Sequence, residues 1–346
     1  MKKILITGAN SYIGMSFDSY LKQWPDKYMV DTMDMIDGSW KEKSFSGYDA
    51  VYHVAGIAHS DHGKISPERA QLYYQVNRDL AVETAKKAKD EGVKQFIFMS
   101  SLGSYGPAHE QMPHRPITER STPCPNTAYG QSKLKAEQCL ISIRDFPYVI
   151  FRPTGIYGPR DKDYALLIDY AMRRPISIAL GRSPQSATFI YIADLVEAVF
   201  LAIEKHVVRR SYFVTDGHTY TGQDFTDTIC ELAGHKHVRH IHIPLWMAHI
   251  AAMMTDTARQ LLGRSFTFNG DKYRILKQRN WTCDIAPLIG DLGYTPQYNL
   301  RRGLTATLLE RLHLTHHTQE VASPELFDVL LGEAFGTQAA REVDEL

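Results

Sequence analysis

The sequence predicts an α/β fold in which a doubly wound parallel sheet is followed by a smaller C-terminal lobe. Short apolar runs alternate with segments of helical periodicity over the first 152 residues, which is the rhythm of a parallel sheet with helices on both faces. A glycine-containing turn directly follows the first apolar run. The length of 346 residues suits one large domain with a lobe, or two modest domains.

The individual elements follow from local apolar patterns and from the residues that end them. The first strand stops at Thr7-Gly8, and Gly92 ends the long helix that follows the third strand. The predicted strands cover residues 3–6, 28–33, 50–54, 95–99 and 148–151. The predicted helices cover residues 13–22, 73–90, 129–143, 194–204, 222–233 and 245–254.

Composition excludes several classes of protein. Acidic and basic residues balance at 39 each, so no overall field predicts a nucleic-acid or membrane-surface binder. The four cysteines form no C-x-x-C pair, which favours a reduced, cytoplasmic setting. No run of about 18 apolar residues predicts a membrane span, and the apolar stretch before Gly8 is too short for a signal peptide.

The first chemical motif is the turn between the first strand and the first helix. Its residues are Thr7, Gly8, Ala9, Asn10, Ser11, Tyr12, Ile13 and Gly14. A dinucleotide diphosphate needs a tight turn, close backbone approach and a helix N-terminus directed at its charge. Gly8 supplies the turn and Gly14 allows close helix packing, but Ser11 occupies the middle position that is usually glycine.

An acidic residue at the end of the second strand is expected to hold the adenosine ribose. Asp31, Asp34 and Asp37 compete for this role, and strand alternation favours Asp34. A carboxylate there accepts hydrogen bonds from the 2′-hydroxyl and repels a 2′-phosphate. The sequence therefore predicts NAD rather than NADP, although a solvated loop acid remains the alternative.

Two further motifs carry candidate catalytic groups. Tyr129 and Lys133 stand at positions i and i+4 of a predicted helix, so they share one face. A cation near the phenol is expected to lower its pKa and to make Tyr129 usable as an acid or base. Ser100-Ser101 follows a strand, at the sheet edge where open α/β sheets bind ligands.

Taken in order, these motifs resemble the extended short-chain dehydrogenase/reductases of the NAD-dependent epimerase/dehydratase group. The resemblance runs from Met1 to about Thr307. It rests on Thr7-Gly8 with Gly14, His53-Val54-Ala55-Gly56, Asn77, Phe98-Met99-Ser100-Ser101, Tyr105-Gly106, Tyr129 with Lys133, Arg152-Pro153 with Tyr157-Gly158-Pro159, Phe189 to Asp194, and Leu292 to Pro296.

The resemblance implies roles for the matching residues. Tyr129 would be the acid/base, Lys133 would lower its pKa and hold the nicotinamide ribose, and Ser101 would be the catalytic serine. NAD would be the cofactor and a small molecule the substrate, with no metal and no nucleic acid; homodimers are common in the family. Further cofactor contacts are implied for Ala55, Gly56, Asn77, Ser100, Pro153 and Ile156, and substrate contacts for Ser101, Gly103, Thr154 and Arg182.

The strand–helix rhythm loosens after Arg152 and the composition changes near the end, so we expect the chain to have three parts. Residues 1–152 would form an NAD(P)-binding Rossmann domain, and residues 153–312 would return to the sheet and form a smaller substrate-binding lobe. Residues 313–346 would be an acidic tail. From Thr318 onward it carries seven acidic residues against one basic residue, with a short amphipathic helix at 326–331 that could remain loose or dock on a partner.

Two positions leave the substrate open. Nucleotide-sugar members of the family usually carry Asn where this chain has Gly155, and Arg where it has Ala187. Arg182 and Arg279 are candidates to replace the lost charge. Hydride transfer at a secondary-alcohol carbon of a nucleotide sugar is the first interpretation, and a hydroxysteroid-like or other apolar alcohol is the second. A non-catalytic NAD-sensing protein is the third, although such proteins typically lose the Tyr or the Lys.

Other features invite functional readings that the sequence does not favour. His235, His237, His240 and His242 alternate near one strand, but a solvated face is a better interpretation than a metal site. Tyr73-Tyr74 and Trp246 are predicted to be packing residues.

Overall fold

The computed structural model describes residues 1–58, 67–107, 115–181, 185–262 and 270–314. Its centre is a six-stranded sheet in which every neighbouring pair is parallel. The strand order is β10 (Arg210–Val214), β5 (Tyr148–Pro153), β4 (Gln95–Met99), β3 (Ala50–His53), β1 (Lys2–Thr7) and β2 (Tyr28–Met33). The predicted doubly wound parallel sheet is confirmed.

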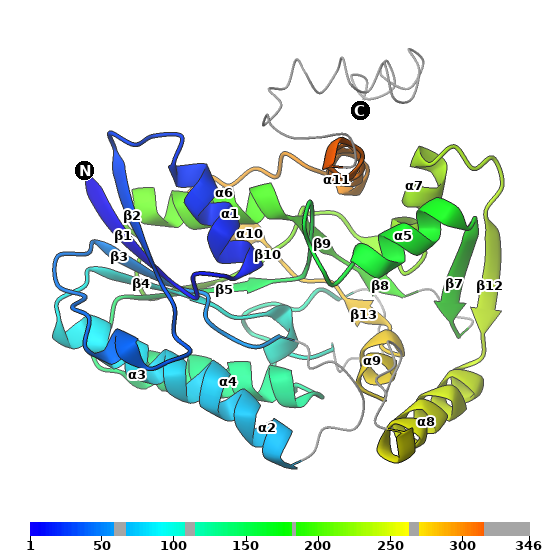
Figure 1. Ribbon diagram of the computed structural model, residues 1–346, viewed down its shortest axis with the longest axis horizontal. Helices are drawn as coiled ribbons and strands as arrows, with labels where there is room; N and C mark the ends of the chain where they lie inside the picture. Colours follow the sequence, from blue (N-terminus) through cyan, green and yellow to red (C-terminus); the bar gives the residue numbers. More distant parts are fainter. Residues whose placement is uncertain (59–66, 108–114, 182–184, 263–269, 315–346) are drawn as a thin grey trace.

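Helices cover both faces of this sheet, as Figure 1 shows. One face carries α1 (Tyr12–Leu21), α6 (Ile192–Glu204) and α10 (Ala286–Leu292), and the other carries α3 (Leu80–Asp90) and α4 (Ala128–Ser142). Strand alternation divides the core between the faces: Ile4 and Ile6 belong to one buried cluster, and Leu5 belongs to the other.

The helix expected at 73–90 is built differently. It starts earlier, as α2 (Pro67–Tyr73), continues through a π-helical turn at Tyr74–Asp79, and then becomes α3. A π turn inserts an extra residue and rotates the following helix face. Asn77 lies in this turn and is fully buried, so the irregular stretch places a polar side chain inside the molecule.

After β5 the chain returns to the central sheet once, as β10, and places α6 and α10 on one face of that sheet, while the other elements form a smaller lobe. Its strands pair as β6 (Gly155–Tyr157) with β9 (Phe189–Tyr191), β7 (Ile176–Leu180) with β12 (Arg239–Ile243), and β8 (Ser186–Ala187) with β11 (Tyr220–Thr221) and β13 (Asn280–Trp281). Its helices are α5 (Ala165–Arg173), α7 (Asp224–Leu232), α8 (Leu245–Leu262), α9 (Gly270–Leu276) and α11 (Leu300–Leu314). Within the described ranges, none of the helices has both the length and the apolar character needed to cross a bilayer.

The strand order reverses between β1 and β3, because the chain passes from β1 to β2 on one side and then to β3 on the other. Ligands of open α/β sheets bind at such a switch point, beyond the carboxyl ends of the strands. Gly8 stands at that end of β1 with a φ of 94°. A Cβ on Gly8 would lie 2.7 Å from the backbone nitrogen of Ala55, just after β3. The two strand ends therefore approach as closely as a glycine permits.

We expect Gly8→Ala to lower the free energy of unfolding by roughly 1–3 kcal/mol, because a methyl group meets backbone in a left-handed conformation. Gly290→Ala is the matched control, since Gly290 lies exposed in α10 with nothing within 4 Å of a Cβ. That change should be neutral or stabilising. Urea unfolding of both variants measures the difference, and equal effects would contradict the close approach.

Candidate active site

The β1–α1 turn is held by backbone bonds and by one side-chain cap. The backbone nitrogen of Gly8 donates to Met33 O at 2.8 Å, and that of Ser11 donates to Gly8 O at 2.9 Å. The Ser11 hydroxyl accepts from the Gly14 nitrogen at 3.0 Å and caps α1. A Cβ on Gly14 would lie 2.6 Å from that hydroxyl oxygen and 3.0 Å from Val54 Cγ2. Ser11 therefore occupies the position that is usually glycine and caps the helix with its hydroxyl. The first backbone N–H groups of α1, at Tyr12 and Ile13, lie at the switch point.

The three aspartates near β2 differ in their partners. Asp31 accepts a hydrogen bond from the Tyr48 hydroxyl at 2.7 Å, and Asp37 accepts one from the Ser39 nitrogen at 3.0 Å. Asp34 directly follows β2, is exposed, and accepts from the Ile36 nitrogen at 3.0 Å. Of the three, Asp34 has the position that the sequence reasoning required, at the carboxyl end of the strand next to β1.

Asn77 joins the end of β3 to helix α4. Its side-chain oxygen accepts from the Ile57 nitrogen at 2.9 Å, and its amide nitrogen donates to Ile57 O at 3.0 Å and to the Ser132 hydroxyl at 3.1 Å. A Cβ on Gly56 would lie 3.0 Å from the Asn77 oxygen and 3.3 Å from Lys133 Nζ. The structure therefore brings together the Ala55-Gly56 segment, Asn77 and Lys133.

Lys133 is a buried lysine at the centre of this arrangement. Its Nζ donates to Met99 O at 2.8 Å and lies 4.7 Å from the centre of the Phe98 ring. Burial lowers the pKa of Lys133 to about 8, and the nearby charge of Glu137 opposes that shift. The ammonium thus tethers α4 to the end of β4 and loses its proton more easily than an exposed lysine.

Tyr129 lies one helical turn before Lys133, beside Ser101. Burial raises the pKa of Tyr129 to about 12, and a hydrogen bond with Ser101 opposes the rise. The expectation that the lysine lowers this pKa is wrong for the protein alone, because desolvation of the phenol dominates. Close packing brings Tyr129 to the turn after β4: a Cβ on Gly130 would lie 2.2 Å from Gly103 O. The Ser101 hydroxyl accepts from the Gly103 nitrogen at 3.1 Å and shapes that turn.

A buried ionic network lies beneath the catalytic candidates, and the sequence reasoning missed it. Glu137 accepts hydrogen bonds from Ser100, from Ser104 at 2.8 Å, and from Arg152 Nε and Nη2 at 3.0 and 2.8 Å. The Ser100 hydroxyl, expected beside the cofactor, is therefore committed to Glu137. The available signal was spacing, since Glu137 follows Lys133 by four residues on the same helix face.

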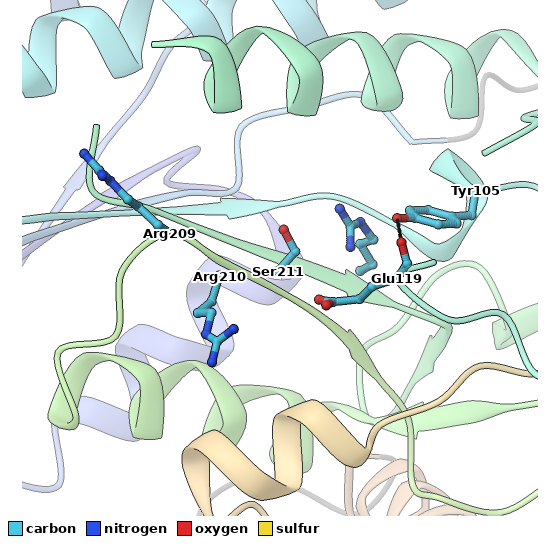
Figure 2. Close-up of a pocket in the computed structure, with 6 residues that line it drawn as sticks. Tyr105, Glu119, Arg209, Arg210 and Ser211 are labelled. Carbon is cyan, nitrogen blue, oxygen red and sulfur yellow. Dashed lines mark hydrogen bonds between the residues drawn. The ribbon is translucent and has the colours of Figure 1, made fainter. Parts of the chain in front are cut away.

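A hollow at the β10 edge of the sheet is lined in part by Arg152, Arg209 and Arg210. Figure 2 shows Arg209 and Arg210 at this edge. The Arg152 guanidinium lies over both the Tyr105 ring and the Phe213 ring, which contact each other edge to face. The arginine charges already have partners, namely Glu137 for Arg152, Asp145 for Arg209 and Asp291 for Arg210. This hollow does not include the catalytic candidates, so we assign it no part in the chemistry.

A loop at residues 161–164 follows β6. The Asp163 carboxylate makes a small contribution to the raised pKa of Tyr129. Asp161 accepts from the nitrogens of Asp163 and Tyr164 at 3.0 and 2.8 Å and shapes this loop. A Cβ on Gly155 would lie 2.2 Å from the Tyr164 hydroxyl oxygen. Tyr164 therefore fills the space that a side chain at position 155 would need.

The remaining candidates for cofactor and substrate contacts lie at the end of β5 or after it in the chain, and some of them lie outside the described residues. Pro153 ends β5 and Ile156 lies in β6, while the Thr154 hydroxyl donates to Val214 O at 3.4 Å. Arg279 is exposed next to β13. Arg182 and the helix expected at 326–331 lie outside the described residues.

The histidine-rich strand shows no metal-binding arrangement. His240 Nε2 lies 2.9 Å from a carboxylate oxygen of Asp227, and no three His, Cys, Asp or Glu side chains in the described ranges are grouped as a metal site requires. Tyr73 is buried, as expected of a packing residue, but Trp246 is 65 % exposed. The packing prediction for Trp246 is wrong, because α8 turns this side chain outward.

Residues 4–214 match the model of the NAD dependent epimerase/dehydratase family. The UDP-glucose 4-epimerase of Vibrio cholerae is 25% identical over 88% of this chain and 94% of its own length. Sterol demethylase protein B of Methylococcus capsulatus is 24% identical over 79% and 87%. The structure of Thermotoga maritima UDP-glucose 4-epimerase with UDP-glucose has a TM-score of 0.68 at 22% identity, covering 91% of this chain and 100% of that chain.

The lowered pKa of Lys133 predicts a pH dependence of stability. Between about 8 in the folded chain and the ordinary 10.5, the unfolded chain holds a proton that the folded chain has released. The free energy of unfolding should therefore rise with pH in this window, by up to about 1.4 kcal/mol per pH unit from this group.

Lys133→Met should remove that part of the rise, whereas Lys135→Met, at an exposed position of the same helix, should keep it. Urea unfolding of the parent and both variants from pH 7 to about pH 10 measures the slope. An identical slope in the parent and in Lys133→Met would show that Lys133 does not titrate as described.

Proposed function

Because the chain belongs to the NAD dependent epimerase/dehydratase family, we propose that it transfers a hydride at a secondary-alcohol carbon of a nucleotide sugar, with Tyr129 as acid and base. The observation that carries the proposal is the convergence of Tyr129, Ser101 and Lys133 at the ends of β4 and α4. NAD is the cofactor of the family and, when bound, supplies the acceptor and donor of the hydride.

The described residues fit such a cofactor. The β1–α1 turn has space only for glycine at position 8, and the start of α1 provides backbone donors for a diphosphate. We assign the diphosphate to residues 8–14 and the adenosine ribose to Asp34. Further cofactor contacts are assigned to Ala55, Gly56, Asn77, Ser100, Lys133, Pro153 and Ile156. Ser100 would contact the cofactor through its backbone, because its hydroxyl donates a hydrogen bond to Glu137.

The proton steps belong to Tyr129 and Ser101. Oxidation of the alcohol releases the hydroxyl proton, which Tyr129 accepts as tyrosinate, and reduction of the carbonyl returns it from the phenol. Ser101, already hydrogen-bonded with Tyr129, would hold the substrate oxygen between the two hydroxyls. Since the pKa of Tyr129 is raised to about 12, mainly by burial, the base form needs positive charge nearby. Lys133, one helical turn away, is the cation that this chain provides.

The substrate lobe supports a nucleotide sugar less directly. We assign Gly103 and Thr154 to contacts with the substrate, and Arg182 and Arg279 to the charge of its diphosphate. Gly155 and Ala187 supply none, and Tyr164 occupies the space beside Gly155. Because of this low charge, and because one relative is named for a sterol, an apolar alcohol is the second candidate.

Tyr129→Phe should lower turnover by about 10²–10⁴-fold, because the ring remains while the proton carrier is lost. NAD affinity, measured by calorimetry, should persist. Tyr170→Phe is the control, since Tyr170 lies 40% exposed on α5. Full turnover in Tyr129→Phe on a substrate that the parent converts would exclude this tyrosine as the acid/base.

The substrate class can be separated by thermal shift in the presence of NAD. UDP, dTDP or GDP should raise the melting temperature by mass action if the lobe binds a nucleotide. The shift should shrink in Arg279→Ala or Arg182→Ala, and it should persist in Arg144→Ala, whose side chain is 93% exposed. A shift with a hydroxysteroid and none with any nucleotide would replace the first candidate by the second.

A further inference from the structure

Helix α8 exposes an unusual number of large apolar side chains. Trp246 is 65% exposed and Met254 is 67% exposed. Soluble proteins expose single apolar residues routinely, but a contiguous group marks an interaction surface. The outward residues of α8 are Leu245, Trp246, Met247, Ile250, Met253 and Met254, with exposed fractions from 37% to 67%.

The exposed residues form one face that points away from the protein body. Only a narrow stripe of α8 is buried among its described side chains, at Ala248 and Ala252, which are 3% and 1% exposed. At 3.6 residues per turn, positions 246, 247, 250, 253 and 254 span an arc of about 120° centred opposite that stripe. Figure 1 shows α8 at the outer end of the smaller lobe, away from the central sheet.

Basic residues accompany this face, although the whole chain is neutral. Residues 235–282 contain eight Lys and Arg against two Asp, and no Asp or Glu occurs from 232 to 255. Arg239 lies exposed on β12 just before α8, and Arg274 and Lys277 lie exposed on or just after α9, which packs against α8. The Tyr273 ring lies 5.0 Å from the His249 ring and joins the two helices.

We propose that α8 docks the protein on the surface of an anionic lipid bilayer. A helix with aromatic, Met, Leu and Ile side chains on one face and cations beside it binds in the plane of the headgroup–acyl boundary. The face is convex and turned outward, so it suits a fluid interface that needs no matching shape. The cations favour anionic headgroups, whose attraction falls off within about a Debye length. The smaller lobe then meets the membrane through α8, which lies in the plane of the interface.

Vesicle co-sedimentation tests the proposal with the full chain. Phosphatidylcholine vesicles with and without phosphatidylglycerol are compared, at low and high salt. The full chain should bind the anionic vesicles and be released by salt. The double change Trp246→Ser with Met253→Gln should lower the partition coefficient at least about tenfold, because each side chain loses its apolar contact. Leu166→Gln is the control, since Leu166 is 64% exposed on α5, and it should bind like the parent.

Trp246 also serves as a reporter within the same experiment. Its fluorescence should shift to shorter wavelength on anionic vesicles, and Trp246→Phe should lose that component while still sedimenting. Unchanged melting temperatures show that the variants remain folded. Absence of binding by the full chain overturns the proposal. Binding that appears only after residues 318–346 are removed assigns the face to the acidic tail, and a dimer that Trp246→Ser dissociates assigns it to a second copy; either result also overturns it.

Discussion

The buried ion pair between Glu137 and Arg152 is the interaction on which the geometry of the site depends. Their side chains are 2% and 5% exposed, so both charges have left water and are compensated mainly by each other and by two serine hydroxyls. Such a pair is weak evidence for stability, because its desolvation offsets much of its attraction. Its effect here is positional: one carboxylate connects α4 to β5 and to both ends of the turn at Ser101.

That connection explains how groups from three elements meet. Tyr129, Lys133 and Glu137 follow one another at four-residue intervals on α4 and share a face. Glu137 fixes the part of α4 that lies furthest from its N-terminus, and Lys133 fixes the middle by donating to Met99 O. At the N-terminal end of α4, the absence of a side chain at Gly130 allows close contact with Gly103. The hydroxyls of Tyr129 and Ser101, to which we assign the proton steps, are therefore positioned by the Glu137 hydrogen bonds, by the hydrogen bond of Lys133 to Met99 O and by the missing side chain at Gly130.

Periodicity and motif order predicted the sheet, its parallel sense and the grouping of Tyr129, Lys133, Ser101 and Asn77, because these depend on local spacing and on strand ends. The π turn around Asn77 was not predictable, since it changes the helix phase without a Pro or Gly to mark it. Glu137 was passed over because a charged residue on a helix is usually solvated, and only the packing of α4 on β5 shows that it is buried. The position of Trp246 depends on tertiary contacts, which the apolar pattern alone does not contain.

The net charge of the chain was also a poor guide to its surface, because a total over all residues conceals local excesses of positive or negative charge. The 39 acidic and 39 basic residues cancel in total, yet the stretch from 235 to 282 is basic and the stretch from 318 onward is acidic. Screening restricts the effect of an exposed charge to about 8–10 Å at ordinary salt. The electrostatic attraction at a given surface therefore depends on the charges within that distance and not on the net charge of the molecule. The neutrality of the whole chain therefore excludes a long-range field, but it does not exclude a local attraction by the few cations near α8.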